Sequence, residues 1–123
     1  MNTKEVMQAV FNKACEAVLA QGEKSMTNGS CMYRGSNGTK CAVGHLITDE
    51  QIASFDIKEG TMAECLPDDL LKEIMPEVPV RDAQLFLGEL QGAHDSSSNY
   101  DFVSSFKHCT NKVADEFGLE RIK

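Results

Sequence analysis

The chain has 123 residues, of which 41% are hydrophobic and 25% are charged. These proportions are typical of a globular domain and exclude a disordered or fibrous chain. The 19 acidic residues outnumber the 12 basic residues and give a formal net charge of -7, which opposes non-specific binding to the phosphates of DNA or RNA. The length predicts a single globular domain over residues 1–123, with one hydrophobic core.

The start of the chain and its cysteines predict a cytoplasmic protein. Residues 1–14 intersperse charged and amide side chains, and they contain no apolar run of signal-peptide length. We also expect no membrane-spanning segment. The five cysteines are an odd number without the regular spacing of a secreted disulfide framework, so we expect reduced thiols.

The first predicted element is an amphipathic helix that ends at Gly22. Asn2 and Glu5 have the spacing of a capping box, and Cys15 is expected to pack as a small buried hydrophobe. The apolar residues that recur at helical spacing are Val6, Met7, Val10, Phe11, Ala14, Val18 and Leu19.

A short antiparallel hairpin is predicted after a polar loop over residues 23–30. Residues 31–34 form the first candidate strand, and residues 39–43 can return antiparallel to it. The GSNG sequence at 35–38 supplies residues that tolerate a positive φ. Because an isolated hairpin is marginally stable in water, we expect this ribbon to lie against the helices.

Two short helices are predicted in the middle of the chain. Thr48 and Gln51 have capping-box spacing, which predicts a helix that begins near Asp49. Pro67 suits the first turn of a second helix, and Pro76 ends it.

The last third of the chain predicts two longer helices. Residues 80–91 carry an apolar surface wide enough to be packed on more than one side, and Gly92 is expected to end this helix. A polar loop over residues 94–99 precedes a final helix that Gly118 closes. The sequence therefore predicts a mainly α (α+β) fold, with four to five helices packed around a short two-stranded antiparallel hairpin.

The predicted hairpin turn carries a candidate binding site. Tyr33, Arg34 and Lys40 supply an aromatic ring, a guanidinium and an ammonium group. Asn37 and Gly38 shape a turn that can bring backbone N–H groups close to an anion. We predict that these five residues bind a nucleotide-type ligand or a partner protein. The turn lacks the glycine spacing of a P-loop, and a plain hairpin with solvated cations is the alternative interpretation.

Two chemical sites are further alternatives. Cys41 and His45 are four residues apart, which on a helix would place a thiol and a base on one face of a small cysteine-dependent enzyme. Cys31, Cys41, His45 and Cys65 are ligands of the kinds that zinc takes, although they lack the closely spaced pairs of a structural zinc module. We expect no cofactor and no metal, with the cysteines packed beneath the ribbon.

The stretch from 31 to 50 carries a distinctive pattern, formed by Cys31, Tyr33, Arg34, Gly38, Lys40, Cys41, Ala42, Val43, Gly44, Leu46, Ile47, Asp49 and Glu50. This pattern resembles one found in small uncharacterised proteins of tailed bacteriophages and prophages. The resemblance covers the first half of the chain, where those proteins also begin with an amphipathic helix. It implies a phage product in a bacterial cytosol, where small accessory proteins modulate host enzymes or block defence systems.

These expectations lead to one preferred hypothesis of function. The chain would be a non-enzymatic phage accessory protein that binds and inhibits a host or anti-phage defence component. Its partner would be a protein or a nucleotide-type small molecule, without membrane binding or non-specific nucleic acid binding. The wide apolar surface over residues 80–90 is compatible with a homodimer.

Overall fold

The computed structural model describes residues 2–27 and 30–122 and contains five α-helices within them. The mainly helical fold that the sequence predicts is therefore confirmed. None of the helices in these two ranges is both long and apolar enough to cross a membrane. The helices are α1 (Thr3–Gln21), α2 (Asp49–Ser54), α3 (Asp68–Ile74), α4 (Val80–Ser96) and α5 (Phe102–Phe117), and the connections contain the 3-10 turns η1 (Ser36–Gly38), η2 (Gly44–Leu46) and η3 (Ala63–Cys65).

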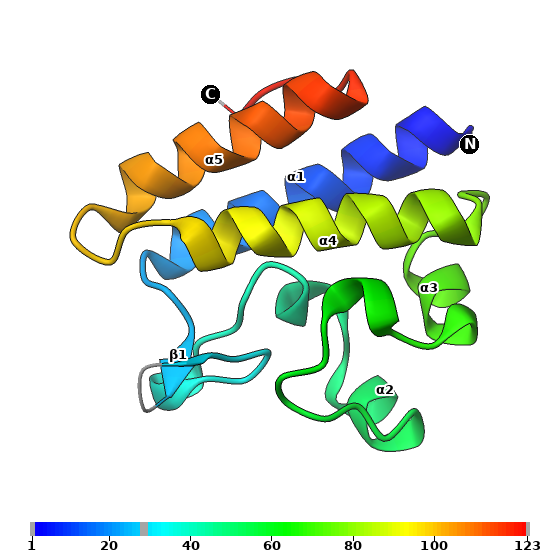
Figure 1. The fold of residues 1–123 in the computed structure, drawn as a ribbon, viewed down its shortest axis with the longest axis horizontal. Helices are drawn as coiled ribbons and strands as arrows, with labels where there is room; N and C mark the ends of the chain where they lie inside the picture. The colour runs from blue at the N-terminus through cyan, green and yellow to red at the C-terminus, as the bar shows by residue number, and fades with distance from the viewer. Residues whose placement is uncertain (1, 28–29, 123) are drawn as a thin grey trace.

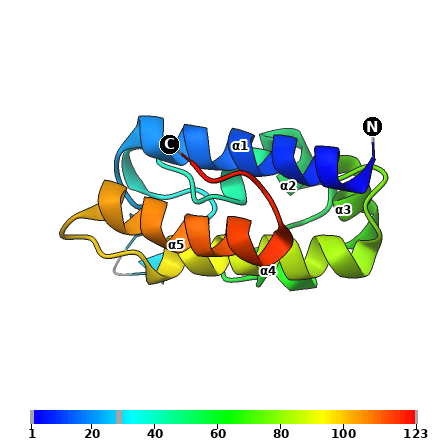
Figure 2. The same cartoon turned by 90° about the horizontal axis from the view of Figure 1, so that it is seen from above.

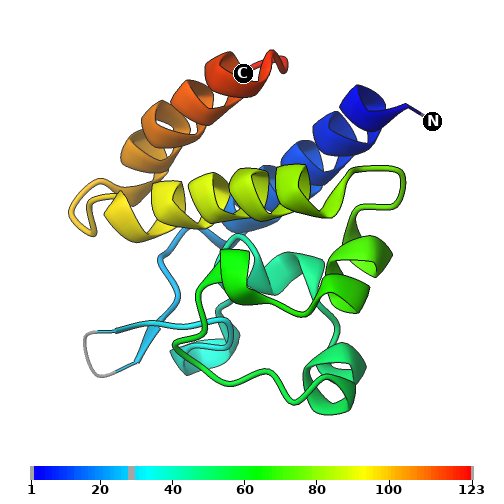
Figure 3. The same cartoon turned by 45° about the vertical axis from the view of Figure 1, so that its right-hand side comes forward.

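The three long helices form one layer, and the shorter elements between α1 and α4 form a second layer beneath it (Figures 1 and 3). The central helix is α4, which packs against α5 on one side and against η3 and α3 on the other. Phe11, Phe86 and Phe106 are fully buried between the long helices. The wide apolar surface of α4 is therefore buried by contacts within the chain. It packs on more than one side, as the sequence predicts.

The chain end after α5 returns toward α1 (Figure 2). The Gln8 side chain on α1 accepts a hydrogen bond from the backbone N–H of Glu120 at 2.7 Å. Leu119 is buried at the same turn. These contacts fix the C-terminal segment against the first helix.

Local capping explains the ends of α1 and α5. The Asn2 side chain accepts a hydrogen bond from the backbone N–H of Glu5 at 2.9 Å, as the capping-box spacing indicates. Gly22 ends α1 with a φ of 77°, and Gly118 ends α5 with a φ of 69°. Glycine adopts this left-handed conformation without steric cost, so both predicted ends are confirmed.

The short helices also begin where the sequence predicts. Thr48 and Gln51 form a reciprocal capping box at the start of α2, with hydrogen bonds of 3.0 and 2.9 Å. Pro67 precedes the first residue of α3, and α3 ends before Pro76.

The predicted end of α4 at Gly92 is wrong, because the helix continues to Ser96. Ala93 and His94 are buried and extend the apolar face past the glycine. The Lys24 side chain then donates hydrogen bonds to the carbonyls of Asp95 and Ser97, at 2.6 and 3.0 Å. This cation satisfies carbonyl groups at the end of the helix that have no partner within it.

The predicted hairpin between residues 31–34 and 39–43 is not formed. The sheet within the described ranges pairs only β1 (Met26–Thr27) with β2 (Ser30–Cys31). The turn itself has the predicted backbone, since Asn37 has a φ of 60° and Gly38 has a φ of 74°. One hydrogen bond of 2.8 Å closes it, from the N–H of Gly35 to the carbonyl of Thr39.

The backbone N–H groups expected to pair residues 31–34 with residues 39–43 instead bond to side chains from distant parts of the chain. The Glu59 carboxylate accepts hydrogen bonds from the backbone N–H groups of Tyr33 and Arg34, at 2.8 and 3.1 Å. On the other side, the N–H of Val43 donates to the side chain of Gln91 at 3.1 Å. These backbone groups therefore have partners without pairing to each other.

Candidate functional site

Tyr33 lies inside the protein, so its ring is not presented to solvent at the 35–38 turn. Only 5% of the residue is accessible to solvent. Its hydroxyl donates a short hydrogen bond to the backbone carbonyl of Thr61. The ring therefore attaches the 32–34 segment to the loop that follows α2.

Arg34 also has a structural role. Its Nη1 and Nη2 atoms donate to the carbonyls of Gly44 at 2.7 Å and Ile47 at 2.6 Å. Its Nε atom donates to Asp49 Oδ1 at 2.9 Å, and this hydrogen bond holds the pKa of Asp49 below its ordinary value. The Nε, Nη1 and Nη2 atoms of the guanidinium therefore all bond to groups around η2, and few of its N–H donors remain for a ligand.

The other three predicted binding residues do not join these two in one cradle. Asn37 and Gly38 are exposed on the closed turn. Lys40 is half-buried, and the Gln21 side chain bonds both its backbone N–H, at 2.9 Å, and its carbonyl, at 3.0 Å. A binding role for Asn37, Gly38 and Lys40 stays a prediction.

Cys41 and His45 are not arranged as a nucleophile and its base. Cys41 is 1% exposed, and its Sγ atom accepts a hydrogen bond from the N–H of Gly44. Burial raises the pKa of the Cys41 thiol to about 12, so the thiol is protonated at neutral pH. The His45 ring instead lies 3.2 Å from the Gln21 side chain.

Cys41, His45 and Cys65, the three candidate zinc ligands whose side chains the structure describes, do not gather into one group. Cys41 is buried and Cys65 is exposed, while the side chain of Cys31 lies outside what the structure describes. Across the described part of the chain, no group of three or more His, Cys, Asp or Glu residues could hold a metal ion.

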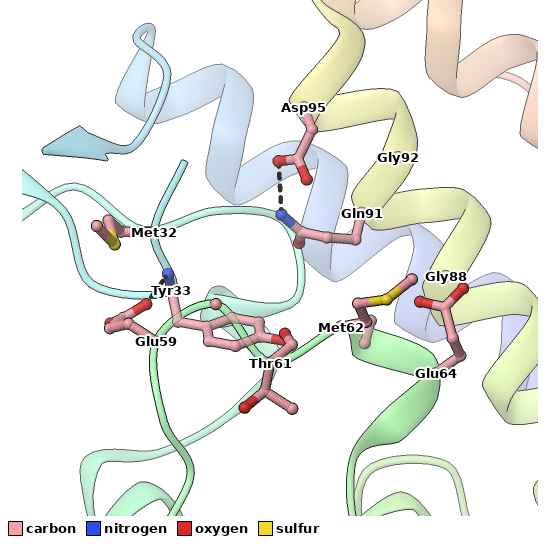
Figure 4. Close-up of a pocket in the computed structure, with 12 residues that line it drawn as sticks. Met32, Tyr33, Glu59, Thr61, Met62, Glu64, Gly88, Gln91, Gly92 and Asp95 are labelled. Carbon is pink, nitrogen blue, oxygen red and sulfur yellow. Dashed lines mark hydrogen bonds between the residues drawn. The ribbon is translucent and has the colours of Figure 1, made fainter. Parts of the chain in front are cut away.

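A pocket of about 550 Å³ lies beside α4, where three separate segments meet (Figure 4). The segment after β2, the loop leading into η3 and one face of α4 each contribute to its wall. The lining residues are Met32, Tyr33, Glu59, Gly60, Thr61, Met62, Ala63, Glu64, Gly88, Gln91, Gly92 and Asp95.

The charged side chains of the pocket are all negative. Glu59, Glu64 and Asp95 line it, and none of its lining residues is Lys, Arg or His. Burial raises the pKa of the Tyr33 hydroxyl above its ordinary value, and the negative charges around the ring raise it further. The pocket therefore favours a positively charged occupant over a negatively charged one.

Two of the three carboxylates are held in place by other groups. Glu59 accepts the two backbone hydrogen bonds from the 33–34 segment. Asp95 bonds to Gln91 Nε2 at 2.9 Å and to His94 Nδ1 at 3.0 Å. His94 is fully buried, and its other ring nitrogen accepts the backbone N–H of Ser25 at 3.4 Å. The imidazole thus fixes Asp95 at the rim of the pocket.

Glu64 is the carboxylate that remains open to a ligand. It is exposed and forms no hydrogen bond or ion pair with any other described residue. Its Oε2 atom would lie 2.9 Å from a Cβ placed at Gly88. The missing side chain at Gly88 is therefore what lets Glu64 lie against α4, inside the pocket (Figure 4).

The sequence prediction missed the acidic residues of this pocket. Glu59 and Glu64 belong to an irregular connection between helices, where charge and hydrophobicity follow no period. The available signal was the pair Gly88 and Gly92, one turn apart within a helix, since glycine weakens a helix and needs a reason to be there.

The pocket can accept a cation through its carboxylates and can contact apolar groups through Met32 and Met62.

In comparisons of this chain with known proteins, no family model, no curated protein and no solved structure matches it.

Proposed function

We propose that this chain is a non-enzymatic accessory protein that binds and inhibits a host or anti-phage defence component in the bacterial cytosol. The acidic pocket beside α4 is the proposed binding site. The observation that supports this proposal is the open Glu64 carboxylate in a cavity of about 550 Å³ that no basic side chain lines. The resemblance of residues 31–50 to phage proteins suggests the biological context.

A lysine or arginine side chain of a partner protein is the best fit to this pocket. A guanidinium or ammonium group can donate hydrogen bonds to Glu64, near the fixed carboxylates of Glu59 and Asp95. The thioether side chains of Met32 and Met62 offer apolar surface to the methylene groups that carry the charge.

A nucleotide-type ligand is disfavoured at this pocket. Its phosphates would meet three carboxylates without a compensating cation among the lining residues. The Arg34 guanidinium, which the sequence suggested for an anion, is bonded to carbonyls and to Asp49. A protein partner with a basic group therefore fits this pocket better than a nucleotide-type ligand does.

Reversal of one charge tests the proposal. We expect affinity-tagged wild-type protein, purified under native conditions from phage-infected or defence-expressing bacteria, to retain a partner protein that the Glu64→Lys variant loses. Glu16→Lys, a matched change at an exposed position of α1, should retain it. Retention of the same partner by Glu64→Lys, or purification of wild-type protein without any partner, would contradict the proposed function.

A further inference from the structure

Two positions on one side of α4, Gly88 and Gly92, carry no side chain. Gly88 and Gly92 are one helical turn apart, so both face the same side. A Cβ at Gly92 would meet no atom within 4 Å, so the helix backbone is uncovered there. Another chain could therefore approach α4 more closely at Gly92 than at a position with a larger side chain.

Two cavities border this glycine surface. The acidic pocket lies on the η3 side of α4, and a second cavity of about 340 Å³ lies on the α5 side. Both cavities have Gly88 and Gly92 in their walls. We call the combined feature the crossing groove: the two cavities together with the glycine surface between them. It passes over α4, which Figure 1 shows running between η3 and α5.

Charge and exposed apolar surface indicate what would occupy the crossing groove. The second cavity adds Glu89 and Glu116 but only one cation, Lys112, so the whole groove stays negative. Met62 is 60% exposed at the acidic end, and Leu85 is 55% exposed one turn before Gly88. A complementary occupant carries positive charge together with apolar surface.

We propose that a basic segment of a partner protein binds in the crossing groove. Its main chain passes over α4 at Gly92, and a lysine or arginine side chain enters the acidic pocket toward Glu64. The inference rests on the proposed function, because it names the chemistry of the partner at the same site. It adds a second requirement, which is an open surface at Gly92.

Gly92→Gln tests this requirement without a folding defect. Gly92 has an ordinary helical φ, and the new side chain points into open space. Because glutamine favours a helix more than glycine does, the melting temperature should stay the same or rise. The side chain would block the path of a segment over α4. Ala20→Gln, at an exposed position of α1, is the matched control.

The experiment selects binding peptides from a random 12-residue library displayed on phage, with the wild-type protein as bait. We expect the selected peptides to be enriched in lysine and arginine. Gly92→Gln and Glu64→Gln should each weaken their binding by at least about tenfold, as for the loss of one well-placed contact, whereas Ala20→Gln should not. Nα-acetyl-arginine amide, a single-residue probe of the acidic pocket, should bind the wild-type protein and lose affinity for Glu64→Gln.

Several outcomes would overturn the inference. If the selected peptides bind Gly92→Gln as tightly as the wild-type protein while Nα-acetyl-arginine amide still requires Glu64, the crossing groove fails and the proposed function stands. If neither the peptides nor the small probe requires Glu64, the crossing groove and the proposed function both fail. Recovery of no binding peptides, or of peptides without basic enrichment, also contradicts the inference. A wild-type dimer that Gly92→Gln dissociates would identify the occupant as a second copy of this chain instead.

Discussion

Arg34 connects a 3-10 turn to a helix through a single side chain. Its guanidinium donates to the carbonyls of Gly44 and Ile47, on either side of the turn, and to the Asp49 carboxylate in the first turn of α2. The fixed, planar fork of donors makes this set of bonds available to arginine and not to lysine, whose single ammonium group cannot reach all three acceptors.

Arg34→Lys is therefore expected to lower the free energy of unfolding by about 2 kcal/mol, because carbonyls of a partly buried turn lose charge-assisted hydrogen bonds. Urea denaturation followed by circular dichroism measures this change. Lys40→Gln provides a control near the same turn and should change stability by no more than about 0.5 kcal/mol. Unchanged stability of Arg34→Lys would show that the guanidinium does not hold the turn.

The three carboxylates of the pocket differ in what their loss would do. Glu59 satisfies two backbone N–H groups, and Asp95 is bonded to the side chains of Gln91 and His94. Substitution at either position would combine a structural defect with any loss of binding. Glu64 has no such structural bonds among the described residues, so it is the position at which a binding role can be tested without a folding defect.

The His45 side chain holds η2 against α1. The His45 ring is half-buried and lies 3.2 Å from the Gln21 side chain. Burial lowers the pKa of His45 below its ordinary value of 6.5, and the positive charges of Lys40 and Arg34 lower it further. The folded protein therefore favours the neutral imidazole.

This pKa shift predicts a loss of stability in mild acid. Below pH 6.5 the unfolded chain binds a proton at His45 more readily than the folded chain does, so stability falls as the pH drops below 6.5 toward the lower folded pKa. His45→Gln removes this titration. We expect its melting temperature to fall less than that of the wild-type protein between pH 7.5 and pH 5.5. Equal decreases in the two proteins would contradict the role of His45.

The elements that the sequence predicts well are those with local determinants. The start of α1 depends on Asn2, the start of α2 depends on Thr48 and Gln51, and the end of α5 depends on Gly118. In each case the side chain or glycine that stabilises the end lies within a few residues of it. Such patterns are readable from the chain alone.

The elements that the sequence mispredicts depend on residues far along the chain. The end of α4 depends on Lys24, which reaches it from the segment after α1. The backbone N–H groups of the expected hairpin instead donate hydrogen bonds to the side chains of Glu59 and Gln91, which follow it by many residues. The pocket has the same origin, because the backbone that Glu59 binds forms part of its wall. No local pattern indicates these contacts.

At the scale of the whole molecule, the formal net charge of -7 and the local charge of the pocket have the same sign. The overall field would attract a basic partner from a distance, and the open carboxylate in the pocket would bind it on contact. The apolar surface over residues 80–90 that suggested a homodimer is largely buried within the chain. Its buried residues include Ala83, Phe86, Leu87 and Leu90.

Recognition of positive charge by the acidic pocket can be tested with an uncharged isostere of arginine. Nuclear magnetic resonance titration would compare Nα-acetyl-arginine amide with Nα-acetyl-citrulline amide, which has nearly the same shape without the charge. We predict saturable shifts of the Tyr33, Glu64 and Gln91 backbone amides with the arginine probe, weaker at high salt, and none with the citrulline probe. Equal binding of the two probes, or shifts of the same amides by adenosine monophosphate alone, would show that the pocket does not recognise positive charge.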